Sequence, residues 1–278
     1  MTKTCSRPIQ GVLVLLLLIP LLFGCWDHTP IEDRAMILAM AIDKVDPETV
    51  RKQGDVTHSS KHDLLTQKPG IRLTAQLGVP GRLPLGATEG GMAVEKPPVW
   101  IVSVVSHTLD SAIADIQQEI ADKVFLGHLR AVIVSEELAR DGLEDLQDYM
   151  RRNPQIRRTV RLAVSKGEAA KFMQTSPPLE RVPALYLTAM LENATELGKF
   201  PSMSLGKFWA FDSARGREPF LSYLEAEKNG NIKLKGLAYF RGNKMVGVTS
   251  PNDIDNYMAI MGMPYGGYHF LSSLPDSD

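Results

Sequence analysis

Ser204 and Lys207 come closer than other residues of this chain to the types and spacing of a catalytic pair. They form the sequence Ser204-Leu205-Gly206-Lys207, which has the Ser-x-x-Lys spacing of the acylating serine in penicillin-binding proteins. That chemistry also uses Ser-Asp-Asn and Lys-Thr-Gly sequences, and neither occurs in the chain. We therefore interpret Ser204 as a turn residue rather than a nucleophile, and we expect no enzymatic activity.

The histidines and paired carboxylates suggest metal or acid–base chemistry only weakly. His58 and His62 are four residues apart, which on a helix would put both imidazoles on one face, but the segment around them is polar and favours a solvated loop. His128 precedes an apolar run and is interpreted as a structural histidine. Glu136 and Glu137 follow Ser135 and are interpreted as first-turn residues of a capped helix. No metal or other cofactor is expected.

Four arginines form a dense basic cluster: Arg151, Arg152, Arg157 and Arg158. One interpretation is that they offset a helix dipole and line a solvated face. The other is that they form a docking surface for an acidic partner.

Cys25 is the residue with the most specific predicted chemistry. Two cations, Lys3 and Arg7, precede an apolar stretch from Val12 to Phe23, and the sequence Leu22-Phe23-Gly24-Cys25 then resembles the cleavage site of a bacterial lipoprotein signal peptide. The Cys25 thiol would carry a diacylglycerol, and two acyl chains anchor a protein stably to a membrane. We expect residues 1–24 to be removed and the rest to lie lipid-anchored on the extracytoplasmic face.

An uncleaved membrane-spanning helix is the alternative for this segment. A span needs about 20 apolar residues. The run here has 12 residues and contains Pro20, which fits the core of a signal peptide better.

The charge of the chain is close to neutral. Without residues 1–24, Lys and Arg fall from 31 to 29 while Asp and Glu stay at 32, a net charge of 29 − 32 = −3. No polybasic run suggests binding to nucleic acid. The 44% of hydrophobic residues permits an ordinary apolar core without disulfides.

Periodicity predicts an α+β fold, with a mixed sheet and packed helices. Strands are expected at 36–42, 71–77, 100–105, 131–134 and 159–164, with a hairpin from 232–240 and 245–249. Helices are expected at 109–124, capped by Thr108 or Asp110, and at 143–152, 167–174 and 183–194, and another is expected to start after an N-cap at Ser135. The segment 43–70 is expected to be loop.

The composition changes to Gly, Ser, Pro and Phe near Leu197. We therefore expect a mixed N-terminal domain at 25–196 and a second, smaller β-rich domain at 197–278.

Three stretches read together resemble the Ger(x)C family. They are Cys25-Trp26-Asp27 with Ile31-Glu32-Asp33 and Ala41-Ile42-Asp43; Leu126-Gly127-His128-Leu129-Arg130 running on to Ala139; and Gly142-Leu143 running on through Arg151-Arg152 to Val164. Ala41 stands where the family commonly has Gly. Members usually continue into a further domain, so we expect either that the usual C-terminal domain is absent from this sequence, which would leave residues 197–278 incomplete, or that this is a shortened member.

The family comprises the lipoprotein C subunits of nutrient germinant receptors of spore-forming bacteria. The resemblance implies an anchored, non-enzymatic subunit on the outer face of the spore inner membrane, with Cys25 lipidated and A and B subunits as partners. A substrate-binding lipoprotein of an import system is the alternative, because it would share the anchor.

Overall fold

The computed structural model describes residues 30, 33–53, 69–80, 97–175, 180–227, 230–250 and 253–263. Contacts divide the chain into two compact units, residues 1–34 and 35–278. All the helices and strands named below belong to the second unit, apart from the first residue of the first strand.

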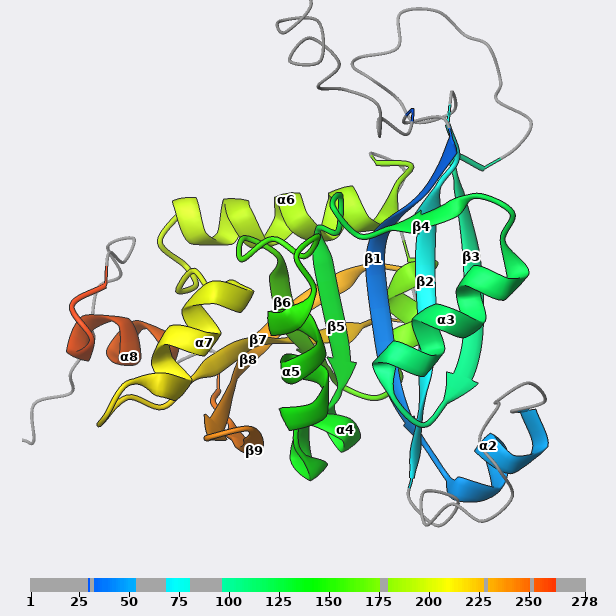
Figure 1. The fold of residues 1–278 in the computed structure, drawn as a ribbon. Helices are drawn as coiled ribbons and strands as arrows, with labels where there is room; N and C mark the ends of the chain where they lie inside the picture. Colours follow the sequence, from blue (N-terminus) through cyan, green and yellow to red (C-terminus); the bar gives the residue numbers. More distant parts are fainter. Residues whose placement is uncertain are drawn as a thin grey trace, which may run out of the picture. The chain divides into compact units, whose positions relative to one another are not determined.

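The described part contains one mixed sheet of nine strands (Figure 1). They are β1 (Arg34–Val45), β2 (Gly70–Gly78), β3 (Val99–Ser106), β4 (Lys123–Phe125), β5 (Ala131–Ser135), β6 (Arg161–Ser165), β7 (Phe220–Ala226), β8 (Ile232–Arg241) and β9 (Lys244–Val248). Their order is β3-β2-β1-β5-β6-β7-β8-β9, and β4 pairs with β1. The four central strands, β1, β5, β6 and β7, pair in parallel. The pairs on one side, β3-β2 and β2-β1, and on the other, β7-β8 and β8-β9, are antiparallel.

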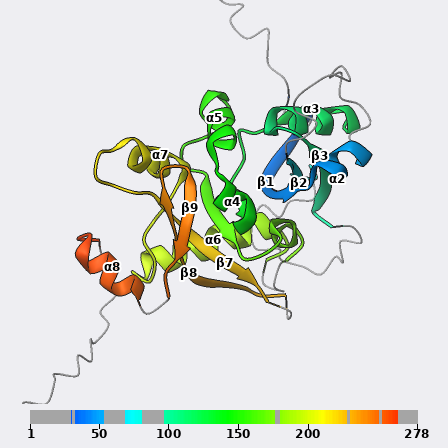
Figure 2. The same ribbon diagram turned by 90° about the horizontal axis from the view of Figure 1, so that it is seen from below.

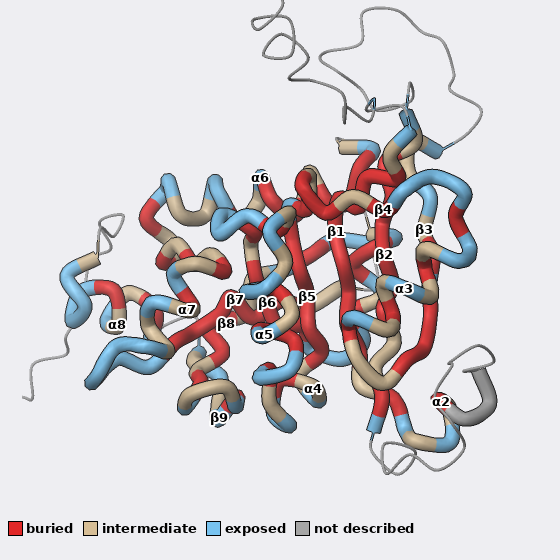
Figure 3. Tube along the Cα trace, viewed as in Figure 1, coloured by how far each residue is buried: buried red, intermediate tan, exposed pale blue. Residues whose placement is uncertain are grey.

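The central strands are buried on both faces, which explains their continuous apolar sequences. All five residues of β5 are buried. Val132 and Val134 belong to one core cluster, whereas Ala131 and Ile133 belong to another. Because side chains alternate along a strand, these clusters lie on opposite faces of the sheet. Figure 3 shows burial concentrated along β1, β5 and β6.

Helices cover both faces. They are α2 (Pro47–Gln53), α3 (Leu109–Glu119), α4 (Glu136–Asp141), α5 (Glu144–Arg152), the 3₁₀ helix η3 (Ala169–Met173), α6 (Pro183–Glu196), α7 (Leu205–Ser213) and α8 (Ile254–Ile260). The larger core contains residues of α3, α4, α5, α7 and α8, and Figure 2 shows α3 and α5 on the same side of the sheet. The other core contains residues of η3 and α6.

The expected α+β class and the expected strands are confirmed. Thr108 caps α3 by accepting the N–H of Ser111 at 3.2 Å, and Ser135 caps α4. The helix predicted at 109–124 is wrong at its end, because Ile120 takes extended backbone. The Gln117 side chain holds this turn, since its Oε1 accepts the N–H of Val124 at 2.8 Å. Val124 consequently belongs to β4.

Several elements were not predicted. Helix α2 lies within the segment expected to be loop, and α7, β7 and α8 lie beyond Leu197. Strands β7, β8 and β9 join the same sheet as β1 to β6. The expected domain boundary at 196/197 therefore falls between two parts of one sheet, and the separate β-rich domain stays a prediction.

Candidate functional site

The basic cluster begins in the last turn of α5. This helix has Glu144 and Asp145 in its first turn and Arg151 and Arg152 in its last, which is the favourable polarity for a helix dipole. Arg152 pairs with Asp148 one turn earlier at 2.5 Å. It is an exposed i,i+4 pair of the kind that adds only a few tenths of a kcal/mol to helix stability, roughly 0.3–0.5.

Arg151 is fixed by a neighbouring helix. Its guanidinium lies 5.4 Å from the ring centroid of Trp209 on α7, and its Nη2 donates to Asp212 Oδ2 at 3.4 Å. A cation over an indole face is attracted by the ring quadrupole. These contacts connect α5 to α7.

Arg157 and Arg158 lie in the exposed turn between α5 and β6. The main chain there is fixed, because Arg158 O accepts the N–H of Gly206 at 2.9 Å and Val160 O accepts the N–H of Leu205 at 2.8 Å. Neither guanidinium has a hydrogen-bond or ion-pair partner within the described residues. The structure thus separates the four arginines into two that are paired and two that are not.

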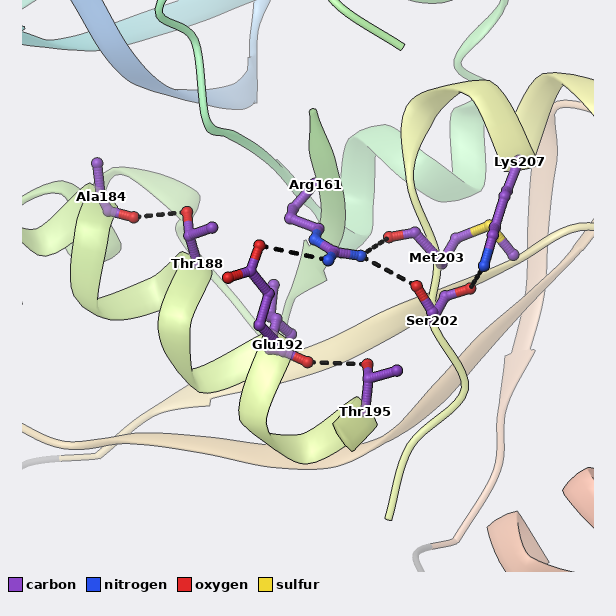
Figure 4. Close-up of polar contacts among 9 residues, drawn as sticks. Arg161, Ala184, Thr188, Glu192, Thr195, Ser202, Met203 and Lys207 are labelled. Carbon is purple, nitrogen blue, oxygen red and sulfur yellow. Dashed lines mark hydrogen bonds and ion pairs between the residues drawn. The ribbon is translucent and has the colours of Figure 1, made fainter. Parts of the chain in front are cut away.

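Ser204 is the N-cap of α7 rather than a turn residue alone. Its Oγ accepts the backbone N–H of Lys207 at 3.4 Å. The ammonium of Lys207 donates instead to the main-chain oxygen of Ser202 at 3.3 Å (Figure 4). Arg161 donates to Ser202 Oγ at 3.1 Å and to Glu192 on α6 at 3.4 Å, so the segment before α7 is tied to β6 and α6. The Ser-x-x-Lys spacing is explained by helix capping.

Asp43 ends the Ala41-Ile42-Asp43 sequence and is buried. Its Oδ1 accepts the N–H of Ala169 at 2.6 Å and its Oδ2 accepts the N–H of Ala170 at 3.0 Å. Burial raises the pKa of Asp43, and it outweighs the two amide donors, which lower the pKa. The carboxylate therefore caps η3 from β1 and holds two distant parts of the chain together.

Gln76 on β2 also holds distant parts of the chain together. It is fully buried; its Nε2 donates to Met173 O at 2.8 Å and its Oε1 accepts the N–H of Ala184 at 3.0 Å. One amide thus holds the end of η3 and the start of α6 against the sheet.

Glu136 and Glu137 face different partners, as expected for adjacent helical residues. Glu136 accepts from Arg140 Nε at 2.8 Å and from the Tyr223 hydroxyl. Burial acts to raise the pKa of Glu136, but the hydrogen bonds from Tyr223 and Arg140 outweigh it and the pKa is lowered. Burial and the bond to Glu136 raise the pKa of Tyr223. Glu137 lies 3.6 Å from Lys44. These carboxylates stabilise the fold and do not form an acid–base pair.

The sequence did not predict a cavity of about 230 Å³ at the carboxyl end of β1. Its wall includes Lys44, which contacts Asp141 at 2.7 Å, and His107, whose Nδ1 is buried and has no hydrogen-bond partner in the part of the chain that the structure describes. The hydrogen bond to Asp141 raises the pKa of Lys44. The cavity forms where β1, β2, α3, α4 and α5 meet, so residues far apart in the sequence line it and a single sequence does not indicate it.

The remaining predicted residues are placed as follows. Cys25, His58 and His62 lie outside the described residues. His128 is half-buried with its ring edge-on to Phe125 at 5.8 Å between centroids. Within the described ranges no group of three His, Cys, Asp or Glu side chains could hold a metal ion. No helix there is long and apolar enough to cross a bilayer.

Comparison with known proteins identifies the family to which this chain belongs. Residues 27–226 match the family described as Spore germination protein N-terminal domain. This chain belongs to that family, Ger(x)C, and is a germination-related protein. No solved structure matches it.

Curated relatives come from Bacillus. The chain is 31% identical to YfkR of Bacillus subtilis (strain 168), over 89% of this chain and 59% of that protein. It is 27% identical to spore germination protein YndF of the same strain, over 96% of this chain and 66% of the relative. With spore germination protein KC it shares 26% identity over 66% of this chain and 39% of the relative. The chain thus spans less than two thirds of the length of each of these relatives.

Proposed function

We propose that this chain is a lipid-anchored accessory subunit of a nutrient germinant receptor, held by Cys25 on the outer face of the spore inner membrane and working beside A and B subunits. The family match supports this proposal, because it runs from residue 27 to 226 and so begins directly after the predicted lipidation site.

The role is structural rather than enzymatic. The Ser-x-x-Lys pair and the adjacent carboxylates that were considered for catalysis are engaged in the fold: Ser204 caps α7, Lys207 bonds Ser202 O, Glu136 bonds Arg140 and Tyr223, and Glu137 pairs with Lys44. Such a subunit would act by holding partner subunits in place.

Deletion of the gene in the native spore former tests this function. We expect loss of the optical-density drop that one nutrient normally triggers, with unchanged spore yield and heat resistance as controls for spore formation. Re-expression of the chain should restore the response. A deletion strain that responds normally to every nutrient would contradict the proposal. Tight binding of a small nutrient by the purified chain would favour the import alternative.

A further inference from the structure

Arg158 borders a hollow of about 510 Å³ beside α5 and α7, and Arg157 precedes it in the same exposed turn. The buried side chains of Met150 and Ile156 contribute apolar wall, and Arg151, Arg158 and Trp209 contribute polar groups. The hollow therefore offers both apolar contact and positive charge.

Two acceptor groups in this wall are already used by the fold. Asn153 Oδ1 accepts the N–H of Gln155 at 3.0 Å, and Arg158 O accepts the N–H of Gly206 at 2.9 Å. Among the described residues the guanidinium of Arg158, a group with donors only, has no partner, and Arg158 is exposed beside the hollow. A complementary ligand must supply acceptors, and a carboxylate has only acceptors.

The charges of the four arginines also favour an acidic ligand. Arg151 and Arg152 are balanced by Asp212 and Asp148. Arg157 and Arg158 are exposed and have no acidic partner in the described chain, so the wall of the hollow carries one uncompensated positive charge and the adjoining residue carries a second. Arg151 is held against Trp209, which keeps one wall of the hollow in place before any partner arrives.

A hollow with buried apolar side chains suits a peptide better than a lipid surface. Single side chains of a peptide can enter a concave site, whereas headgroups of a bilayer approach a protein as a broad plane. A guanidinium also binds a carboxylate with two parallel hydrogen bonds, which gives geometric specificity as well as attraction.

We propose that this hollow docks an acidic segment of a partner protein, with carboxylates paired to Arg158 in its wall and to the neighbouring exposed Arg157, and with an apolar side chain against Met150 and Ile156. The proposal rests on the proposed function, because a subunit needs a surface that meets its partner.

Peptide binding to the full chain in detergent micelles tests the docking site. The probe is a fluorescent peptide of alternating Glu and Leu, read by anisotropy at low and high salt. Arg158→Glu should weaken binding by about tenfold or more, and Arg158→Gln by about threefold, because like charge across an interface is repelled while neutralisation only removes attraction. High salt should weaken binding by the unaltered chain, since exposed charges are screened.

Lys123→Glu is the matched control, because Lys123 is exposed on β4 and the charge change is the same. It should leave peptide binding within about twofold of the unaltered chain, since it lies outside the hollow. Arg157→Glu provides a second variant at an exposed position whose side chain does not line the hollow, in case Arg158→Glu disturbs the turn.

Equal effects of Arg158→Glu and Lys123→Glu, or no effect of either, would overturn the docking proposal. So would weakened binding to phosphatidylglycerol vesicles with peptide binding intact, because that result would assign the arginines to lipid. The deletion experiment is independent of these measurements. A germination defect in the deletion strain, together with unaltered peptide binding by Arg158→Glu, rejects the docking site alone. Normal germination of the deletion strain rejects the proposed function.

Discussion

Replacing Asp43 by Ala should destabilise the protein by about 2–4 kcal/mol. The substitution removes the acceptors at 2.6 and 3.0 Å from the N–H groups of Ala169 and Ala170, and Ala169 is fully buried. A hydrogen bond to a charged group contributes about 1.5–3 kcal/mol, and a buried N–H left unsatisfied costs about 1–3 kcal/mol. Burying the carboxylate itself costs free energy, as the raised pKa of Asp43 indicates. This cost offsets part of what the two hydrogen bonds contribute, so the expected net loss is about 2–4 kcal/mol.

Urea unfolding of the purified chain measures this difference. With a slope of about 3 kcal/mol per molar urea, a loss of 3 kcal/mol lowers the midpoint by about 1 M. Asp43→Asn keeps one acceptor oxygen and should lower it by less. Asp122→Ala is the control, because Asp122 is exposed and its side chain has no partner in the described residues; a surface change of this kind shifts stability by under about 0.5 kcal/mol.

The reasoning would be refuted if Asp43→Ala shifted the midpoint no more than Asp122→Ala does. It would also be refuted if Asp43→Asn were the more damaging change. Either result would mean that η3 is not held to β1 by this carboxylate.

Three further predictions concern other positions. Gly236→Ala should lower the free energy of unfolding in urea by about 1–3 kcal/mol, because an added Cβ would overlap the main-chain oxygen of Thr249. An unchanged free energy of unfolding would mean that the backbone at Gly236 and Thr249 can move apart without cost. Ser204→Ala should cost about 1 kcal/mol or less through the lost cap and leave nutrient-triggered germination intact, whereas a germination defect at normal protein level would revive a catalytic role. Glu136→Gln should remove a pH-dependent part of stability. The folded pKa of Glu136 lies below its ordinary value of 4.5, so its contribution is present above that value and lost as the pH falls through the lowered pKa; parallel stability–pH curves for both proteins would contradict this.

Local features of the fold could be predicted because their causes are local. The apolar run at 36–42 and the alternation at 71–77 define β1 and β2, and Thr108 and Ser135 cap helices through bonds to residues three positions later. Short elements such as α7 were missed, because a nine-residue segment containing Gly206 and several aromatic residues has no clear period.

Long-range features could not be predicted from one sequence. Asp43 binds an amide 126 residues away, and Gln76 binds groups about 100 residues away. Parallel pairing of β1 with β5 likewise depends on which strands meet in space. The same limit applies to the arginines: the sequence showed the cluster, but only the structure shows that Arg151 and Arg152 are paired while Arg158 borders a hollow.

The central claim is that Cys25 anchors a germination subunit, and substitution of that residue tests it most directly. Spores carrying Cys25→Ala are compared with spores carrying Cys5→Ala, which changes the other cysteine of the chain and lies within the predicted signal peptide. Immunoblots of the inner-membrane fraction and nutrient-triggered loss of optical density are measured together. We predict that Cys25→Ala abolishes both the membrane location and the response, and that Cys5→Ala abolishes neither. An unchanged location and response in Cys25→Ala spores would contradict the lipid anchor and favour the uncleaved helix.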